Sequence, residues 1–277
     1  MVRVAAIQMN SGADVAGNLA AADRLLGAAA ADGCGIAVLP ENFALMPVRG
    51  RDKSKHAEDE GDGPIQAFLA DAGRRHGLWI VGGSIPLRTT DPDRVYGATV
   101  VVDNHGQQQA VYRKIHLFDV DLPDRGQSYR ESNSMMPGND VVIVETPVGK
   151  IGLTICYDLR FPELFRELLD RGATLFSVPA AFTAVTGKAH WHTLLRARAI
   201  ENLAWVIAPG QSGTHPDGRE TYGHSLICDP WGRIVAEMPG GEGMVAADVD
   251  LAAVEKLRQE FPALSNRRLH QDNRKDN

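Results

Sequence analysis

Short apolar runs alternate with stretches of helical periodicity along the first half of the chain. The runs at Val2–Met9 (VRVAAIQM) and Ile36–Leu39 (IAVL) predict buried strands. Between them, apolar residues recur at helical spacing after Asn18, which we expect to cap a helix that Gly33 ends. The alternation continues with a helix from Pro64 to Gly77 and strands over 78–85, 96–102 and 109–113.

The second half of the chain repeats this pattern. It predicts helices over 161–169 and 190–202 and strands over 141–145, 151–156, 174–178, 204–208, 224–228, 233–237 and 243–248. Two strand–helix–strand units therefore occur, one ending in IAVLPE and the other in LFSVPA. Because strands outnumber helices and hairpins are mixed with crossovers, the pattern favours an α/β fold. Two stacked mixed sheets with helices outside are the most economical arrangement of these elements.

Composition narrows the class of protein. The 277 residues include 29 Lys and Arg against 35 Asp and Glu, a formal net charge of −6, which argues against a nucleic-acid partner. Hydrophobic residues make up 44% and charged residues 23%, as in ordinary globular proteins. No linker divides the chain, so we expect a single domain over residues 1–264 and a polar tail over 265–277.

Nothing in the sequence predicts a membrane or secreted protein. The longest stretch without Asp, Glu, Lys or Arg, residues 172–187, contains Pro179 and is shorter than the ~20 residues that span a bilayer. The first ten residues lack the pattern of a signal peptide. The 3 cysteines include no CxxC pair and form no evident disulfide framework. We therefore expect a cytoplasmic protein.

Three reactive residues stand just beyond apolar runs. Glu41 follows IAVLP, Lys114 follows AVYR, and Cys156 ends IGLTIC. Ligands of open α/β sheets bind beyond the carboxyl ends of the strands, so these side chains are candidates for one site. A thiol nucleophile, a carboxylate base and an ammonium that stabilises an oxyanion suit acyl transfer. Taken singly, each has an ordinary structural interpretation, such as a buried inert thiol or a surface charge.

Longer motifs around these residues resemble a known family. The segments VLPENF (38–43), YRKIHLFDVD (112–121) and GLTICYDLRFPELFR (152–166) resemble the nitrilase, or carbon–nitrogen hydrolase, superfamily, and the resemblance extends over residues 3–268. The segments ESNSMMPG (131–138), TGKAHWHTLLRARAIEN (186–202) and YGHSLICDPWG (222–232) are similar to its Nit-type amidase branch, especially to members acting on deaminated glutathione.

The resemblance implies a four-layer αββα sandwich and a catalytic set. In that set Glu41 is the general base, Lys114 stabilises the oxyanion, Cys156 is the nucleophile, and Glu131 orients the lysine and the substrate. The backbone N–H of Tyr157 is expected to be a second oxyanion donor. No metal or cofactor is required. The resemblance also implies a homodimer or higher homo-oligomer, in which the C-terminal tail is able to cross to the partner.

The expected reaction follows from the same resemblance. It is hydrolysis of the terminal carboxamide of a small carboxylate-bearing metabolite to acid and ammonia through a cysteine thioester, with deaminated glutathione as the leading substrate. The alternatives are an ω-amidase for α-ketoglutaramate or α-ketosuccinamate and an N-carbamoyl amidase. An inactive binding or assembly protein is the alternative of a different class, against which the four intact catalytic positions argue.

Other polar and aromatic residues have both structural and functional interpretations. Arg160 either pairs with Asp158 to hold the turn after the nucleophile or receives a substrate carboxylate. Phe182 and Thr183 are either pocket walls or core residues. The charged segment 42–63 is either a lid or a solvated loop.

The remaining histidines, cysteines and Trp191 have mainly structural interpretations. His190 and His192 lie two residues apart, on different faces of a predicted helix, so they do not form a zinc-binding pair. We expect structural roles for the other candidates, which are Cys34, Cys228, His116 and Trp191.

Overall fold

Two β-sheets pack face to face in the computed structural model, which describes residues 1–48, 52–122 and 127–269. The first sheet has parallel strands at its centre and antiparallel strands around them. In spatial order, its strands are β17 (Gly243–Val249), β1 (Val2–Gln8), β2 (Ile36–Val38), β3 (Trp79–Val81), β5 (Val95–Val102) and β4 (Ile85–Arg88), with β6 (Gln108–Arg113) also paired to β5.

The second sheet has the same mixed character. Its central strands are parallel and its outer strands antiparallel. In spatial order they are β16 (Ile234–Met238), β15 (Ser225–Cys228), β12 (Trp205–Ala208), β11 (Leu175–Ser177), β10 (Gly149–Leu153) and β9 (Ile143–Thr146). Two small hairpins lie outside both sheets: β7 (Asp119–Leu122) with β8 (Gln127–Arg130), and β13 (Ser212–Thr214) with β14 (Glu220–Tyr222).

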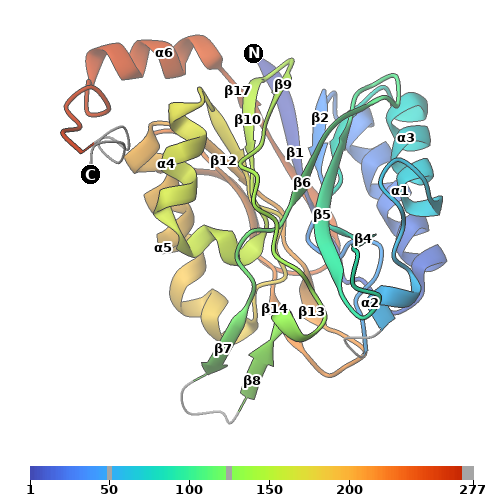
Figure 1. Cartoon of the computed structure of the whole chain (residues 1–277). Helices are drawn as coiled ribbons and strands as arrows, with labels where there is room; N and C mark the ends of the chain where they lie inside the picture. Colours follow the sequence, from blue (N-terminus) through green and yellow to red (C-terminus); the bar gives the residue numbers. More distant parts are fainter. Residues whose placement is uncertain (49–51, 123–126, 270–277) are drawn as a thin grey trace.

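Helices cover the outer face of each sheet (Figure 1). Helices α1 (Val15–Ala31) and α3 (Pro64–His76) lie on the first sheet, and α4 (Pro162–Asp170) and α5 (Ala184–Asn202) lie on the second. The predicted four-layer αββα sandwich is therefore confirmed. The short α2 (Asp52–Lys55), two 3-10 turns (Glu131–Asn133 and Cys156–Arg160) and α6 (Leu251–Glu260) complete the described elements.

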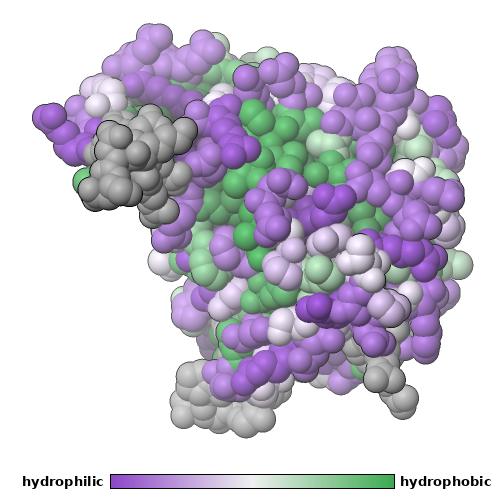
Figure 2. Space-filling model, in the orientation of Figure 1, coloured by the Kyte–Doolittle hydropathy of each residue, from purple (hydrophilic) through white to green (hydrophobic). Residues whose placement is uncertain are grey.

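The alternation of side chains along β1 explains how one strand serves two cores. Val4 and Ala6 face the second sheet and belong to the core between the sheets, whereas Ala5 and Ile7 face α1 and α3 and belong to the core beneath those helices. A strand buried on both faces has no polar positions to alternate, which is why residues 4–7 (VAAI) of β1 are continuously apolar. Figure 2 shows the molecule from the same side as Figure 1. Hydrophobic residues gather near the centre of this face, over the strands, and hydrophilic residues surround them.

Three boundaries differ from the sequence prediction. Asn18 is not the cap of α1, because the Asp14 carboxylate accepts from the backbone N–H groups of Ala16 and Gly17 and starts the helix earlier. The predicted strand over 78–85 is broken at Gly83, whose φ of 51° redirects the chain into β4. Strand β10 ends at Leu153, so Cys156 lies in the turn beyond it.

Other elements lie outside the sequence prediction. Helix α5 begins at Ala184, earlier than the predicted residue 190, because the Thr183 hydroxyl caps it by accepting from Thr186 N–H. Helix α6 and the two hairpins carry no strong periodicity and were not predicted. Within the predicted tail, Arg267 forms an ion pair with Asp170 of α4, and residues 270–277 lie outside the described part. None of the described helices is both long and apolar enough to cross a membrane.

Candidate active site

The carboxyl ends of strands from both sheets place the predicted reactive side chains together. Glu41 follows β2 and Lys114 follows β6 in the first sheet, while Cys156 follows β10 in the second. All three line one pocket, together with Glu131 from the 3-10 turn after β8. The structure therefore brings together four residues that are far apart in the sequence.

Lys114 is the centre of a buried ion-pair network. Its side chain is 1% exposed, and its Nζ donates to Glu41 Oε1 at 2.8 Å and to Glu131 Oε2 at 2.9 Å. Each carboxylate is held by the backbone as well: Glu41 Oε2 accepts from Ala181 N–H at 2.9 Å, and Glu131 Oε2 accepts from Phe118 N–H at 2.7 Å. These contacts leave little rotational freedom to any of the three side chains.

Burial and the neighbouring charges shift the pKa values of this network in opposite directions, and the charges have the larger effect. Burial acts to lower the pKa of Lys114, but the carboxylates of Glu131 and Glu41 raise it well above 10.5. Burial acts to raise the pKa of Glu41, but the charge and hydrogen bond of Lys114 lower it below 4.5. At neutral pH the lysine is therefore protonated and Glu41 is ionised.

Cys156 lies at a strained turn that positions its thiol. Its φ of 50° is in the left-handed region that side chains other than glycine rarely adopt, and its N–H donates to Pro179 carbonyl at 2.8 Å. The carboxylate of Asp158, fully buried, holds this turn. It accepts from Ile155 N–H at 2.8 Å, from the Tyr112 hydroxyl at 2.6 Å and from His116 N–H at 3.1 Å.

The thiol of Cys156 is protonated in the resting site. Burial and the neighbouring charge of Glu41 raise its pKa well above 9.0, although Lys114 acts in the opposite direction. The thiol and the Glu41 carboxylate lie close enough for each to shift the pKa of the other. An ionised carboxylate beside a thiol is able to remove its proton as the sulfur attacks a carbonyl. Lys114 beside them offers positive charge to a developing oxyanion.

The pocket above the thiol has a volume of about 950 Å³, counting the open space at its mouth. Its wall includes the four further site residues predicted from the sequence: Tyr157, Arg160, Phe182 and Thr183. Tyr157 lies in the first turn after Cys156, where backbone N–H groups have no partner within the helix.

Arg160 is held over aromatic rings. Its guanidinium lies 5.2 Å from the Phe182 ring centroid and 5.7 Å from that of Tyr157. The expected ion pair of Arg160 with Asp158 does not form; among the described residues, Asp158 contacts Tyr112 and His116 instead.

Three further cations line the pocket, Lys53, Arg130 and Arg219, and the sequence patterns indicated none of them. Lys53, half-buried in α2, has its pKa lowered mainly by burial, against the pull of Glu131 and Glu41. Arg219 pairs with Asp217 at 3.2 Å and lies over the Tyr129 ring. The charged segment 42–63 therefore borders the pocket in part, although residues 49–51 lie outside the described ranges. Only its high density of charge distinguished this segment in the sequence.

The remaining candidates have structural environments. His116 stacks on Phe161 with ring centroids 3.7 Å apart and is not part of the pocket wall. Cys34 and Cys228 are buried away from the pocket, and burial raises their pKa to about 11 and about 12. Trp191 is 1% exposed and packs against Phe182.

Comparison with known proteins gives a consistent result. A model of the carbon–nitrogen hydrolase family matches residues 3–259. The chain is 40% identical over 266 residues to a protein of Yersinia enterocolitica named deaminated glutathione amidase, covering 96% of this chain and 92% of that one. The human protein of the same name is 39% identical over 269 residues, covering 96% and 82%.

Solved structures show the same similarity in three dimensions. The C. elegans NitFhit protein superposes with a TM-score of 0.88 at 37% identity; the match covers 96% of this chain but 65% of that one. A Saccharomyces cerevisiae protein described as a member of branch 10 of the nitrilase superfamily superposes with a TM-score of 0.86 at 32% identity, covering 97% of both chains.

Proposed function

Because the chain belongs to the carbon–nitrogen hydrolase family and is therefore a hydrolase of non-peptide C–N bonds, we propose that it is a cysteine-dependent amidase with deaminated glutathione as its substrate. The observation that carries the proposal is the placement of Cys156, Glu41 and Lys114 in one pocket, where the Glu41 carboxylate lies 2.8 Å from the Lys114 ammonium. Each step of amide hydrolysis has a suitable group in this arrangement.

In the first half of the reaction, Cys156 Sγ attacks the amide carbon while Glu41 takes the thiol proton. The oxyanion receives hydrogen bonds from Lys114 and from the N–H of Tyr157, and such preorganised donors contribute about 3–4 kcal/mol each. The protonated Glu41 then gives its proton to the leaving nitrogen. The C–N bond breaks, the amine departs, and a thioester remains on the sulfur.

In the second half, water attacks the thioester. Glu41 takes a proton from that water, and the same two donors hold the second oxyanion. Collapse of the intermediate breaks the C–S bond and returns the proton to sulfur, which releases the carboxylic acid and the free thiol. Glu131 contacts no reacting atom in this scheme; it acts by holding Lys114 in position.

Support for the substrate comes from the named relatives and from the cations of the pocket. Deaminated glutathione carries two carboxylates, and Arg160 and Lys53 are able to receive them beyond the thiol. Its scissile amide joins the oxo-acid part to the cysteine nitrogen. The release of ammonia expected from the sequence is therefore wrong for this substrate, because the leaving amine is the dipeptide cysteinylglycine. Ammonia leaves only from primary amides such as α-ketoglutaramate or α-ketosuccinamate.

This difference in leaving group provides the test. Purified protein is given deaminated glutathione, α-ketoglutaramate, α-ketosuccinamate and N-carbamoyl amino acids, and both the released acid and the released amine or ammonia are measured. We expect the highest kcat/KM for deaminated glutathione, with cysteinylglycine and acid formed in equal amounts. A higher kcat/KM for any other compound overturns the substrate assignment, and no turnover of any compound favours the inactive binding protein.

We further propose a cytoplasmic homodimer or higher homo-oligomer that binds neither nucleic acid nor membranes. The net charge of −6 supports the exclusion of nucleic acid. Large apolar side chains of α5, the β15–β16 turn and β16 are about half exposed, as expected of a surface that another copy covers: Ile200 at 47%, Trp231 at 51% and Val235 at 46%. Light scattering on the purified chain measures the assembly directly.

A further inference from the structure

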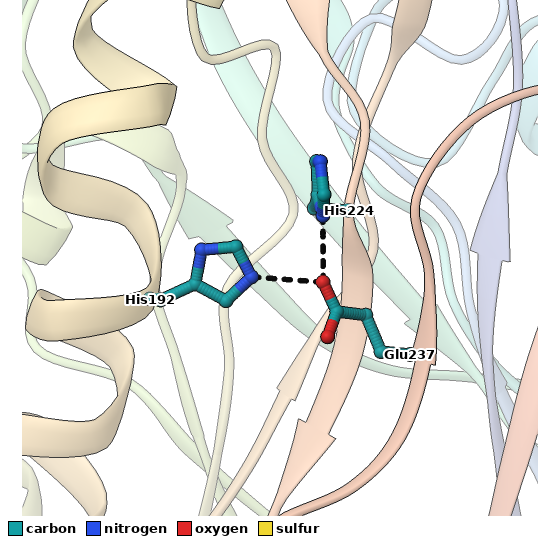
Figure 3. Close-up of side chains that lie close together, drawn as sticks. All are labelled: His192, His224 and Glu237. Carbon is teal, nitrogen blue, oxygen red and sulfur yellow. Dashed lines mark hydrogen bonds and ion pairs between the residues drawn. The ribbon is translucent and has the colours of Figure 1, made fainter.

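Two histidines and a glutamate from three separate elements converge outside the pocket (Figure 3). His192 lies on α5, His224 in the turn between β14 and β15, and Glu237 on β16. His192 Nε2 lies 2.8 Å and His224 Nδ1 lies 2.6 Å from the same oxygen, Glu237 Oε1. All three donor atoms lie within 4.8 Å of one another.

The surroundings of this cluster hold it in shape. The His224 ring stacks on the Tyr222 ring, with centroids 4.2 Å apart and an angle of 21° between the planes. The backbone carbonyl of His224 accepts from Trp191 Nε1 at 2.8 Å, which ties the turn to the residue next to His192 on α5. Gly187 allows the helix to approach closely, because a Cβ there would lie 2.3 Å from Tyr222 side-chain atoms.

We propose that His192, His224 and Glu237 bind a divalent transition-metal ion of the zinc class. Imidazole nitrogens and a carboxylate oxygen are ligands that Zn²⁺ prefers, and three protein ligands leave a fourth position for water. The three side chains are partly exposed in the single chain, at 31%, 24% and 29%, so an ion reaches them from solvent before another copy covers this face. The cluster is therefore accessible as well as held in shape.

Metal binding requires only a small movement. Ligand atoms around a tetrahedral zinc ion with bonds of about 2.0–2.1 Å lie about 3.3 Å apart. The present nitrogen–oxygen separations of 2.8 and 2.6 Å must therefore widen by roughly 0.5 to 0.7 Å. A rotation of the Glu237 carboxylate supplies this change, and the two ring nitrogens, which lie within 4.8 Å of each other, must reach the same spacing of about 3.3 Å.

Metal binding also requires each imidazole ring to change the nitrogen that carries its proton. The two nitrogens that face Glu237 donate hydrogen bonds to it, so each neutral ring carries its proton on that side. When a metal ion replaces those bonds, each proton must move to the opposite nitrogen, His192 Nδ1 or His224 Nε2. Neither of these atoms has a hydrogen-bond partner in the described part of the chain, so both are open to solvent protons.

This site is separate from the proposed amidase chemistry. None of the three residues lines the pocket of Cys156. Two neighbouring residues connect them to the pocket wall. Trp191 packs against Phe182 with ring centroids 5.0 Å apart, and Tyr222, on which His224 stacks, donates its backbone N–H to the Phe182 carbonyl at 2.9 Å. A bound ion would therefore fasten α5 to the β14–β16 region and stabilise the wall, without taking part in the reaction.

Zinc titration of the chelator-treated protein tests the proposal. The background is Cys156→Ser, so that the catalytic thiol contributes no ligand. We expect one equivalent of Zn²⁺ to bind, and Glu237→Gln and His192→Ala each to weaken binding at least ~10-fold. His190→Ala, on the same helix but outside the cluster, is the matched control and keeps full affinity. Failure to bind zinc, or equal affinity in Glu237→Gln and its parent, overturns the proposal.

Two further measurements distinguish loss of the proposed site from unfolding of a variant and from zinc binding at another place on the protein. Bound Co²⁺ should give a visible absorption band of nitrogen and oxygen ligation and no thiolate charge-transfer band; a thiolate band contradicts the assignment. The melting temperature should rise with added Zn²⁺ in the parent and in His190→Ala but not in Glu237→Gln. An equal rise in Glu237→Gln places the ion elsewhere.

Discussion

The ammonium of Lys114 lies 2.8 Å from Glu41 Oε1, although 73 positions separate the two residues in the chain. Both groups are almost completely removed from water, and each holds the other in its charged form. An ionised base beside a protonated cation is the state in which a neighbouring thiol is able to lose its proton. Catalysis and stability in acid should therefore both depend on this pair and on the groups that hold it.

Replacement of the proposed nucleophile should abolish amide hydrolysis while preserving the fold. Cys156→Ser keeps the size of the side chain but substitutes a much poorer nucleophile, so kcat should fall at least ~10⁴-fold. Circular dichroism and the melting temperature should stay close to wild type. Cys228→Ser, at a buried cysteine outside the pocket, is the matched control for loss of a thiol and should retain activity. Turnover of Cys156→Ser near the wild-type rate contradicts the mechanism.

The ion pair also makes a pH-dependent contribution to stability. The pKa of Glu41 in the folded protein is below its ordinary 4.5, so its ionised form favours folding above pH 4.5, and this contribution is lost as the pH falls through the lowered pKa. The difference in free energy of unfolding between wild type and Glu41→Gln should therefore be constant near neutrality and shrink below pH 4.5. Denaturant titrations at several pH values measure it. A difference that grows in acid contradicts the direction of the shift.

Arg160 should act on substrate binding more than on chemistry. Its guanidinium is held over Phe182 and Tyr157 without a carboxylate partner among the described ion pairs, which leaves it available to a substrate carboxylate. Arg160→Met should raise KM about 10- to 100-fold for substrates with a carboxylate, with a smaller change in kcat. Arg74→Gln, an exposed substitution on α3, is the control. An unchanged KM in Arg160→Met excludes this role.

The turn that carries Cys156, the proposed nucleophile, depends on Asp158. This carboxylate is fully buried and accepts from Tyr112, Ile155 and His116. Asp158→Asn replaces acceptors by a donor and should cost about 1–3 kcal/mol of unfolding free energy, with kcat reduced as well. Tyr112→Phe removes one bond to this carboxylate and a longer one of 3.4 Å from Ile115 N–H, and should cost less. Chemical denaturation and steady-state kinetics check both variants, and equal stability of Asp158→Asn and wild type contradicts the proposed support.

Hydrophobic periodicity predicted the helices and strands that are held mainly by the burial of their apolar residues. Long-range contacts set the boundaries and turns that the sequence pattern did not predict. The two strand–helix–strand units were predicted because their faces repeat at strand or helix spacing. The end of β10 was predicted three residues too late, at Cys156 instead of Leu153, because the run IGLTIC stays largely apolar. The Asp158 carboxylate that accepts from Ile155 N–H beyond the strand is held by Tyr112, which is 46 residues away in the chain. The residues near Cys156 in the sequence carry no information about a contact with a residue so far away in the chain.

The residues of the candidate site were also predicted only in part. The family motifs marked Glu41, Lys114, Glu131 and Cys156, and the structure places these four side chains together. Lys53 was missed because its place in the pocket depends on the path of a charged, non-periodic segment. The partners of His192 were missed for a similar reason, since they lie on later strands and turns and form no sequence motif with it.

The site has a further consequence because its parts come from both sheets. The hydrogen bond from Ala181 N–H to Glu41 joins a loop after β11 to a loop after β2, so neither sheet alone assembles the proposed catalytic groups. During refolding, enzymatic activity should therefore return only after the two halves have docked, later than the recovery of secondary structure. The catalytic rate thus reports the completion of tertiary assembly.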